Sequence, residues 1–281
     1  MKFCNWAFIA LLCVSSVTCC TSQPTALYTA AETVLQYDRS QLKRAFVFLK
    51  LDIKLKICAQ LGDNEICQEG KETATASGFV IDRLDKSFDI ITAAHFCTDH
   101  LGKIEKTRTI AGVDYRAVGE STLTITDYAG HVFIHEQNKI IAQDIRNNID
   151  ICMIRVNDVT SKLDILPAEL ADNPPAWGDY IFHVGAPHGT FAPGEPMIFL
   201  GVFIGRPNDR DVYIVSTYTL PGSSGGMIVD TRGQVIGMII EYIPTVQPHG
   251  GNATTLTNIR QFICENVEQS RRPIFDCSNK T

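Results

Sequence analysis

Apolar and polar residues alternate strictly between Leu49 and Ile57, and this alternation constrains the fold more than any other feature of the chain. Every second residue is leucine or isoleucine, and the residues between them are lysine or aspartate. A period of two residues predicts a long β-strand with one buried face and one exposed face. The polar, glycine-bearing segment that follows, residues 60–72, is interpreted as a loop.

Shorter strand signals recur along the rest of the chain. They fall at residues 76–82, 88–91, 121–126, 131–134, 151–156, 180–185, 198–204, 212–215, 226–230 and 235–242. Many short strands at regular spacing are typical of an all-β sandwich or barrel. Only residues 26–45 and an amphipathic stretch near residues 256–267 have a helical pattern.

The bulk composition is that of a globular chain with its own core. Of the 281 residues, 45% are hydrophobic and 20% are charged, which is ordinary for a folded domain. The net charge of −6 argues against nucleic-acid binding as the main role. No C-x-x-C pair occurs, so a zinc site is not expected, and no metal or organic cofactor is predicted.

The first twenty residues have the pattern of a secretory signal peptide. Lys2 supplies a positive charge, and an apolar stretch with its centre at residues 6–12 follows. The stretch is too short for a comfortable membrane span, so we expect cleavage and export, either secretion or residence in the cell envelope. The mature chain would then have no stable membrane span. A retained membrane anchor is the alternative, and Cys19 or Cys20 offers a site for lipidation.

Six cysteines follow the predicted signal peptide: Cys58, Cys67, Cys97, Cys152, Cys264 and Cys277. An even number of cysteines in an exported chain favours disulfides. Short separations favour the pairs Cys58–Cys67 and Cys264–Cys277. The remaining two, Cys97 and Cys152, form either a third disulfide or a pair of buried free thiols.

Three short motifs carry the candidate chemistry: TAAH at residues 92–95, NID at 148–150 and GSSGG at 222–226. A serine hydroxyl becomes a good nucleophile when a histidine base lies within hydrogen-bond reach and an acid orients that histidine. His95, Asp150 and Ser224 supply these three groups, each beside a strand signal. Gly222 permits a sharp turn, so the backbone N–H groups of Gly222 and Ser224 are the candidate oxyanion hole.

Each motif also has an ordinary structural explanation. A cluster of glycine and serine is commonly a turn, and a single histidine is more often structural than catalytic. Asp150 could be a plain carboxylate at a strand end, and Asp144 is a rival for its role. Asp150 is favoured because an apolar strand follows it directly and would bury the carboxylate beside the histidine.

The His and Ser motifs resemble those of trypsin-like serine proteases, and the wider sequence is most similar to the HtrA-type bacterial branch. The wider similarity lies in residues 77–82, 147–156, 178–189 and 230–237. The resemblance implies an all-β fold of two six-stranded antiparallel barrels with the triad in the cleft between them, followed by a C-terminal helix. The order His, Asp, Ser along the chain is that of the chymotrypsin-like folds.

The resemblance also implies a plan for the domains. The expected parts are a signal peptide at 1–20, a helical segment at 21–44, the protease domain at 45–265 with its junction near 157–178, and a tail at 266–281. Too few residues follow the predicted helix for a PDZ domain, which HtrA proteins usually carry. An oligomer formed through residues 24–44 is an option that the resemblance offers.

The implied function is that of a serine endopeptidase, which cleaves protein or peptide substrates through an acyl-enzyme. Ser223 stands where trypsins have an aspartate before the nucleophile, so activation through that ion pair is not expected. The implied specificity pocket has its base at Tyr218 and Thr219 and a wall at Ile240, Glu241 and Tyr242. Because the base has no aspartate and carries a tyrosine, we expect a shallow apolar pocket and no cleavage after lysine or arginine.

Two other functions stay open at this point. A protease-like fold that no longer cleaves would act as a binding protein. An esterase or acyltransferase could use the same three residues, although the absence of alternating strands and helices argues against the usual esterase fold.

Overall fold

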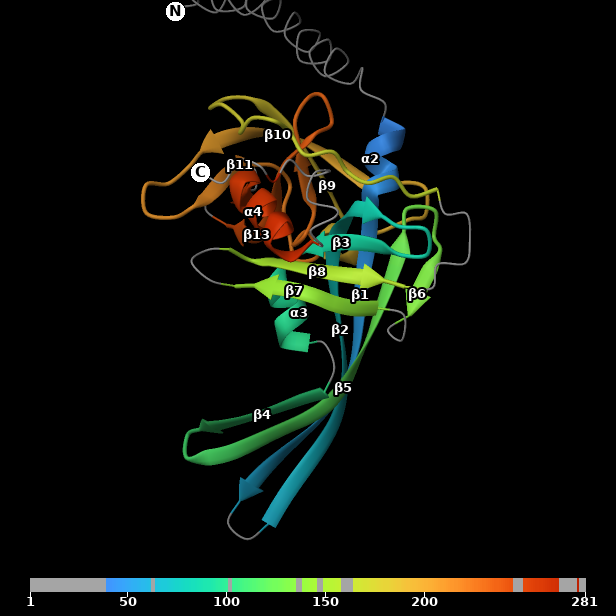
Figure 1. Ribbon diagram of the computed structural model, residues 1–281. Helices are drawn as coiled ribbons and strands as arrows, with labels where there is room; N and C mark the ends of the chain where they lie inside the picture. The colour runs from blue at the N-terminus through green and yellow to red at the C-terminus, as the bar shows by residue number, and fades with distance from the viewer. Residues whose placement is uncertain are drawn as a thin grey trace, which may run out of the picture. The chain divides into compact units, whose positions relative to one another are not determined.

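The described part of the chain is mostly β-structure and forms two sheets (Figure 1). In this computed structural model it comprises residues 39–61, 64–100, 103–134, 138–145, 149–157, 164–244, 250–267 and 277. The predicted signal peptide, the candidate lipidation sites Cys19 and Cys20 and most of the predicted N-terminal helical segment lie outside the described residues.

The first sheet has eight strands in the order β4-β5-β1-β2-β3-β8-β7, and β6 pairs with β5. All of its pairings are antiparallel. The strands are β1 (Phe46–Leu61), β2 (Asn64–Arg83), β3 (Phe88–Thr92), β4 (Lys103–Ile110), β5 (Val113–Asp127), β6 (Val132–Ile134), β7 (Asn138–Asp144) and β8 (Ile151–Val156).

The second sheet is a closed barrel of six strands in the order β10-β11-β14-β13-β12-β9. The strands are β9 (Tyr180–Gly185), β10 (Met197–Gly205), β11 (Val212–Ser216), β12 (Met227–Val229), β13 (Val235–Ile243) and β14 (Gly250–Thr255). The helices are α2 (Arg39–Ala45), α3 (Ala94–His100), α4 (Leu256–Asn266) and the 3-10 helix η3 (Pro187–Gly189). The predicted all-β fold with two barrel-like halves and a C-terminal helix is confirmed, although the first sheet has eight strands and not six.

The alternation in β1 decides which of its faces enters the core. Leu49, Leu51 and Ile53 are buried, and the register places Leu51 opposite Leu123 and Leu49 opposite Ile125 of β5. Complete burial of one such side chain contributes about 1.5–3 kcal/mol. All residues of β3, and all but Arg155 of β8, are buried. This burial on both faces explains why their sequences are continuous apolar runs.

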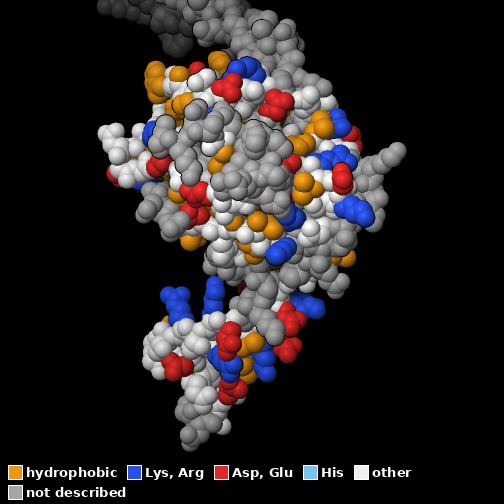
Figure 2. Space-filling view, in the orientation of Figure 1, with side chains coloured by type: hydrophobic (Ala, Val, Ile, Leu, Met, Phe, Trp, Pro, Cys, Tyr) orange, Lys and Arg blue, Asp and Glu red, His pale blue; other side chains and the backbone are white. Residues whose placement is uncertain are grey.

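Residues 60–72, interpreted from the sequence as a loop, belong mainly to β2, so that expectation was wrong. β1 and β2 stay paired out to Leu61 and Asn64, and β4 and β5 extend the outer sheet beside them. These outer halves form a four-stranded arm, clear of the rest of the sheet in Figure 1. Residues 64–73 are exposed on both faces, so no buried face left an apolar pattern in the sequence. Side chains of both charges cover the arm in Figure 2, which disfavours edge-to-edge aggregation.

The six cysteines form three disulfides. Cys58–Cys67 joins two directly opposed residues of the arm, and Cys264 of α4 is joined to Cys277. These are the pairings that the short separations favour. Cys97 and Cys152 form the third disulfide, so the alternative of two free thiols does not apply to this structure.

Helix α4 follows the predicted amphipathic pattern. Its apolar side chains Leu256, Ile259 and Ile263 are buried, and the side chain of Thr255 caps its first turn by accepting a hydrogen bond from the N–H of Asn258. Within the described residues, no helix combines the length and the apolar character needed to cross a membrane.

The two sheets meet where β2 passes the loop that precedes β12. Ser77 is fully buried there, and its N–H donates to the carbonyl of Ser224 at 2.8 Å. Its hydroxyl donates to the carbonyl of Gly222 at 2.8 Å and accepts from the N–H of Ala186 at 2.9 Å. One strand residue of the first sheet therefore holds two segments of the second half.

Gly225 lies in this junction at a position that leaves no room for a side chain. Its φ is +84°, and a Cβ added to it would overlap the carbonyl oxygen of Ser77 and Oγ1 of Thr92. Any side chain at this position would push the loop away from β2. Glycine is required here for its conformation and for the close approach.

Gly225→Ala should lower the free energy of unfolding by about 3 kcal/mol, because a left-handed conformation costs about 1–2 kcal/mol and steric overlap adds a similar amount. Gly178→Ala is the matched control, since Gly178 has a φ of +87° and a Cβ there would meet nothing within 4 Å. Urea denaturation of both variants measures the difference. Equal losses would contradict the close contact.

Candidate active site

His95 lies in the first turn of α3, directly after strand β3. The chain turns from strand to helix at Ala93 and Ala94, which are both fully buried. Their small side chains let this turn lie against the core. The imidazole remains partly accessible, with 41% of the side chain exposed.

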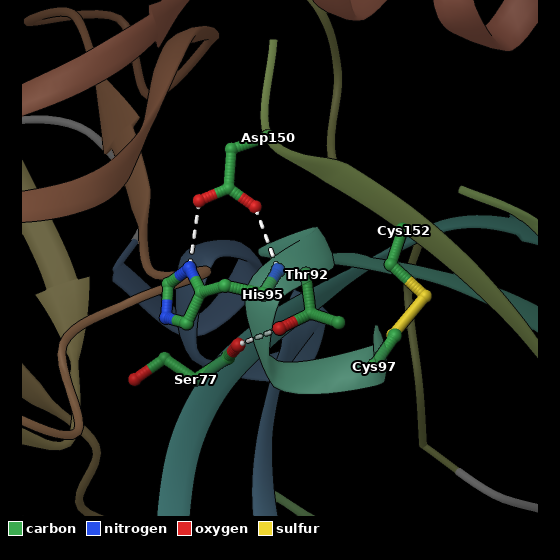
Figure 3. Close-up of a disulfide and its surroundings, with 6 residues drawn as sticks. All are labelled: Ser77, Thr92, His95, Cys97, Asp150 and Cys152. Carbon is green, nitrogen blue, oxygen red and sulfur yellow. Dashed lines mark hydrogen bonds and ion pairs between the residues drawn. A yellow bond between two sulfur atoms is a disulfide. The ribbon is translucent and has the colours of Figure 1, made fainter. Parts of the chain in front are cut away.

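Asp150 immediately precedes β8, and its carboxylate accepts two hydrogen bonds from His95 (Figure 3). The backbone N–H of His95 donates to Oδ1 at 2.8 Å, and the ring Nδ1 donates to Oδ2 at 2.6 Å. Because a carboxylate can only accept, Nδ1 carries the proton and Nε2 is the basic nitrogen of the neutral ring. The geometry thus gives the histidine the tautomer that a general base requires.

Asp144, the rival acid, ends strand β7 opposite Ile151. The two hydrogen bonds to His95 favour Asp150 for the orienting role. In the contact between His95 and Asp150, the aspartate is the more buried partner, with 16% of its side chain exposed.

A second His–Asp contact shows that such a pair alone does not identify an active site. The backbone N–H and Nδ1 of His131 each donate to the carboxylate of Asp127 at 2.8 Å. This pair closes the turn between β5 and β6, where Gly130 also bonds to the carbonyl of Asp127 at 3.1 Å. His95 differs from His131 in that the strand end before it contacts the loop at residues 222–226.

The GSSGG loop, residues 222–226, lies against the strand end that leads to His95, since a Cβ on Gly225 would be 3.1 Å from the backbone nitrogen of Ala93. The carbonyl of Ser224 accepts from Ser77, and the carbonyl of Ser77 accepts from Oγ1 of Thr92 at 2.7 Å. Thr92 is three residues before His95, and Figure 3 shows Ser77, Thr92 and His95 together. Ser77 therefore holds the loop that carries Ser224 and the strand end that leads to His95.

The N–H groups of the loop divide into two sets. Those of Ser223, Gly225 and Gly226 donate to the carbonyls of Leu220, Ile239 and Ser223, at 2.9, 2.7 and 2.8 Å. Among the described residues, no acceptor engages the N–H groups of Gly222 and Ser224. These two are the donors that the sequence analysis proposes for an oxyanion hole.

The residues proposed for the pocket base lie just before the loop. Thr219 is fully buried, and its hydroxyl donates to the carbonyl of Gly250 at 2.6 Å. Tyr218 is 38% exposed, and its ring packs against that of Phe199 with 5.1 Å between centroids.

The residues proposed for the pocket wall lie on β13, next to this base. Tyr242 pairs with Gly251 of β14, and a Cβ on Gly251 would be 3.0 Å from Cγ2 of Thr219. The carboxylate of Glu241 accepts from Asn252 at 2.7 Å, and Ile240 is half-buried beside it in the strand. The structure thus brings the proposed base and wall together.

His183 in β9 is a buried histidine that the sequence analysis did not single out. Its Nδ1 donates to the carbonyl of Tyr218 at 3.0 Å, and its ring stacks on Phe199. Its Nε2 is buried without a hydrogen-bond partner in the described part of the chain. Burial lowers the pKa of His183 from 6.5 to about 4, although the bond to Tyr218 acts in the opposite direction. The ring is therefore neutral at pH 7. In the sequence, a single histidine within an apolar strand does not indicate that its ring is buried beside Tyr218 and Phe199.

Comparisons with known proteins point to one family. The sequence model of the trypsin-like peptidase domain matches residues 76–238, which are more than half of the chain and include all three motifs. No curated protein matches the chain.

Solved structures that are similar to this chain include two of Rv3671c. The crystal structure of Rv3671c protease in an inactive form has 17% identity and a TM-score of 0.49, and the match covers 82% of this chain and 92% of that chain. An inactive serine-to-alanine mutant of Rv3671c from M. tuberculosis has 16% identity and a TM-score of 0.50, with 81% and 89% of the two chains covered. At these identities the likeness concerns the fold alone.

His183 should make folding depend on pH between about 6.5 and about 4. In this range the unfolded chain binds a proton on His183 and the folded chain does not, so the free energy of unfolding falls as the pH falls. Between about pH 7 and about pH 4.5 the wild type should lose about 2 kcal/mol more than His183→Leu. Urea denaturation at both pH values measures this difference, and equal losses in the two proteins would show that His183 titrates normally.

Proposed function

Because the chain belongs to the trypsin-like peptidase family, we propose that it is a serine endopeptidase with Ser224 as nucleophile, His95 as general base and Asp150 as orienting acid. One observation carries the proposal. His95 donates two hydrogen bonds to Asp150, and the strand end before His95 is linked through Ser77 to the loop that contains Ser224. Family membership makes the chain a protease. The roles of the individual residues are our assignment.

The proposed reaction follows the general triad scheme. Oγ of Ser224 attacks the carbonyl carbon of the peptide bond, and its proton passes to Nε2 of His95. The carboxylate of Asp150 stabilises the imidazolium that forms. His95 then gives the proton to the leaving amine, and an ester to Ser224 remains. A water molecule, activated by His95, hydrolyses this ester and restores the enzyme.

The oxyanion of each tetrahedral intermediate would face the N–H groups of Gly222 and Ser224. The positive φ of Gly222 supports this assignment, because it turns the peptide units of the loop in a way that other residues rarely allow. Loss of one such donor typically costs about 2.7–4 kcal/mol of transition-state stabilisation.

Export is proposed for the same chain. Its three disulfides are typical of proteins from oxidising compartments, which agrees with the signal-peptide pattern of the first twenty residues. The substrates would then be proteins or peptides outside the cytoplasm.

Labelling with a fluorophosphonate probe tests the roles of the triad. The wild type should be labelled, Ser224→Ala should not, and His95→Ala should react about a thousandfold more slowly because the serine has lost its base. His131→Ala is the matched control, since it removes the other histidine with the same aspartate contact. It should keep the wild-type rate. A folded wild type that resists the probe would contradict the proposal and favour a binding protein with a protease fold.

Substrate profiling tests the proposed pocket. With Tyr218 at the base and Tyr242 on the wall, the pocket should accept small or medium apolar side chains before the cleaved bond. A peptide library treated with the wild type and analysed by mass spectrometry gives the profile. Dominant cleavage after lysine or arginine would contradict the assignment of these residues.

A further inference from the structure

The Cys97–Cys152 disulfide joins the same two segments as the hydrogen bonds between His95 and Asp150 (Figure 3). Cys97 is two residues after His95 on α3, and Cys152 is two residues after Asp150 on β8. The covalent bond and the two hydrogen bonds therefore act on one short stretch of each segment.

The disulfide lies where the regular pairing of the two strands stops. The ladder between β3 and β8 ends at Thr92 and Cys152, and β3 then gives way to α3. Backbone pairing with β8 consequently does not extend to His95. Helix α3 has seven residues, and a helix of that length is not stable without tertiary contacts.

The environment of this disulfide also sets it apart from the Cys58–Cys67 disulfide. Cys97 and Cys152 are 2% and 0% exposed, and both belong to the core cluster of the first sheet, together with Phe96 of α3. The Cys58–Cys67 disulfide lies on the arm, where Cys67 is exposed. Only the buried disulfide is in a position to control where α3 lies.

We infer that the Cys97–Cys152 disulfide is a positioning element of the His95–Asp150 pair, so that the reactivity of Ser224 depends on whether this bond is formed. The inference rests on the proposed function of these residues. A general base must reach its nucleophile with the correct distance and angle, and small displacements slow the reaction strongly. With the disulfide broken, α3 loses its covalent link to β8 and is held by non-covalent contacts, among them the bonds to Asp150.

The chemical step that breaks the bond is a thiol–disulfide exchange. A dithiol reductant attacks one sulfur, and a mixed disulfide forms and then resolves. The products are two thiols, at Cys97 and Cys152, and the oxidised, cyclic disulfide of the reductant, so two electrons and two protons pass to the protein. A small-molecule disulfide oxidant reverses the step. The protease would thus be reactive in an oxidising compartment and slow in a reducing one.

The test compares C97A/C152A with the matched control C58A/C67A, both in the full chain. Each protein is labelled with the fluorophosphonate probe across a range of pH, and its fold is checked by circular dichroism and thermal melting. The core variant should react at least about tenfold more slowly than the wild type, because its histidine is misplaced. Its pH profile should also shift, since the contact of His95 with Asp150 is altered. The control should match the wild type in rate and profile.

A disulfide with a purely structural role would give a different result. The core variant would then melt at a lower temperature, but its folded fraction would react at the wild-type rate with the wild-type pH profile. That outcome would overturn the inference about the disulfide and leave the proposed function of the triad in place. An oxidised, folded wild type that does not react with the probe removes the proposed function, and the inference with it.

A second measurement applies if the core variant does not fold. The wild type is treated with a dithiol, and mass spectrometry reports which cysteines are reduced while the labelling rate is followed. A rate that falls as Cys97 and Cys152 become thiols, and recovers on reoxidation, supports the inference. An undiminished rate in protein whose Cys97 and Cys152 are reduced overturns it.

Discussion

The contact between Ser77 and the loop at residues 222–226 is the interaction on which the candidate active site depends. Ser77 is fully buried, and its N–H, carbonyl and hydroxyl groups all form hydrogen bonds, to this loop, to Ala186 and to Thr92. Buried polar groups are costly when unpaired. A shift of the loop would break two of these bonds at once, and a third, from Oγ1 of Thr92 to the carbonyl of Ser77, holds the strand end before His95.

Three histidines of this chain show that the surroundings of a histidine decide what it does. His95 and His131 make the same two contacts with an aspartate, but His131 closes a hairpin turn, whereas the strand end before His95 contacts the GSSGG loop. His183 is enclosed between Phe199 and the carbonyl of Tyr218, and burial keeps it neutral. Of these three, His95 is the one for which we propose the role of general base.

The sequence predicts those parts of the fold whose burial leaves a pattern. Strands β8 and β9 are apolar runs because they are buried, and both were expected at the observed residues. The outer part of β2 is exposed on both faces, so its sequence looks like a loop. β14, with the sequence GGNATT, is a strand because β11 and β13 pair with it on either side. In the candidate site, the three motifs could be recognised from the sequence. The link through Ser77 and the location of His183 could not, because they depend on contacts between segments that are distant in the chain.

The two sides of the candidate site are held by different kinds of interaction. The loop with Ser224 is held by packing and hydrogen bonds, and the absence of a side chain at Gly225 lets it approach β2. The segment with His95 is held by a covalent bond beside its contact with Asp150. Packing and hydrogen bonds respond to temperature and denaturant, whereas a disulfide also responds to the redox state of the compartment. In the proposed mechanism both sides must stay in register, so a change on the His95 side should slow the reaction while the rest of the fold remains intact.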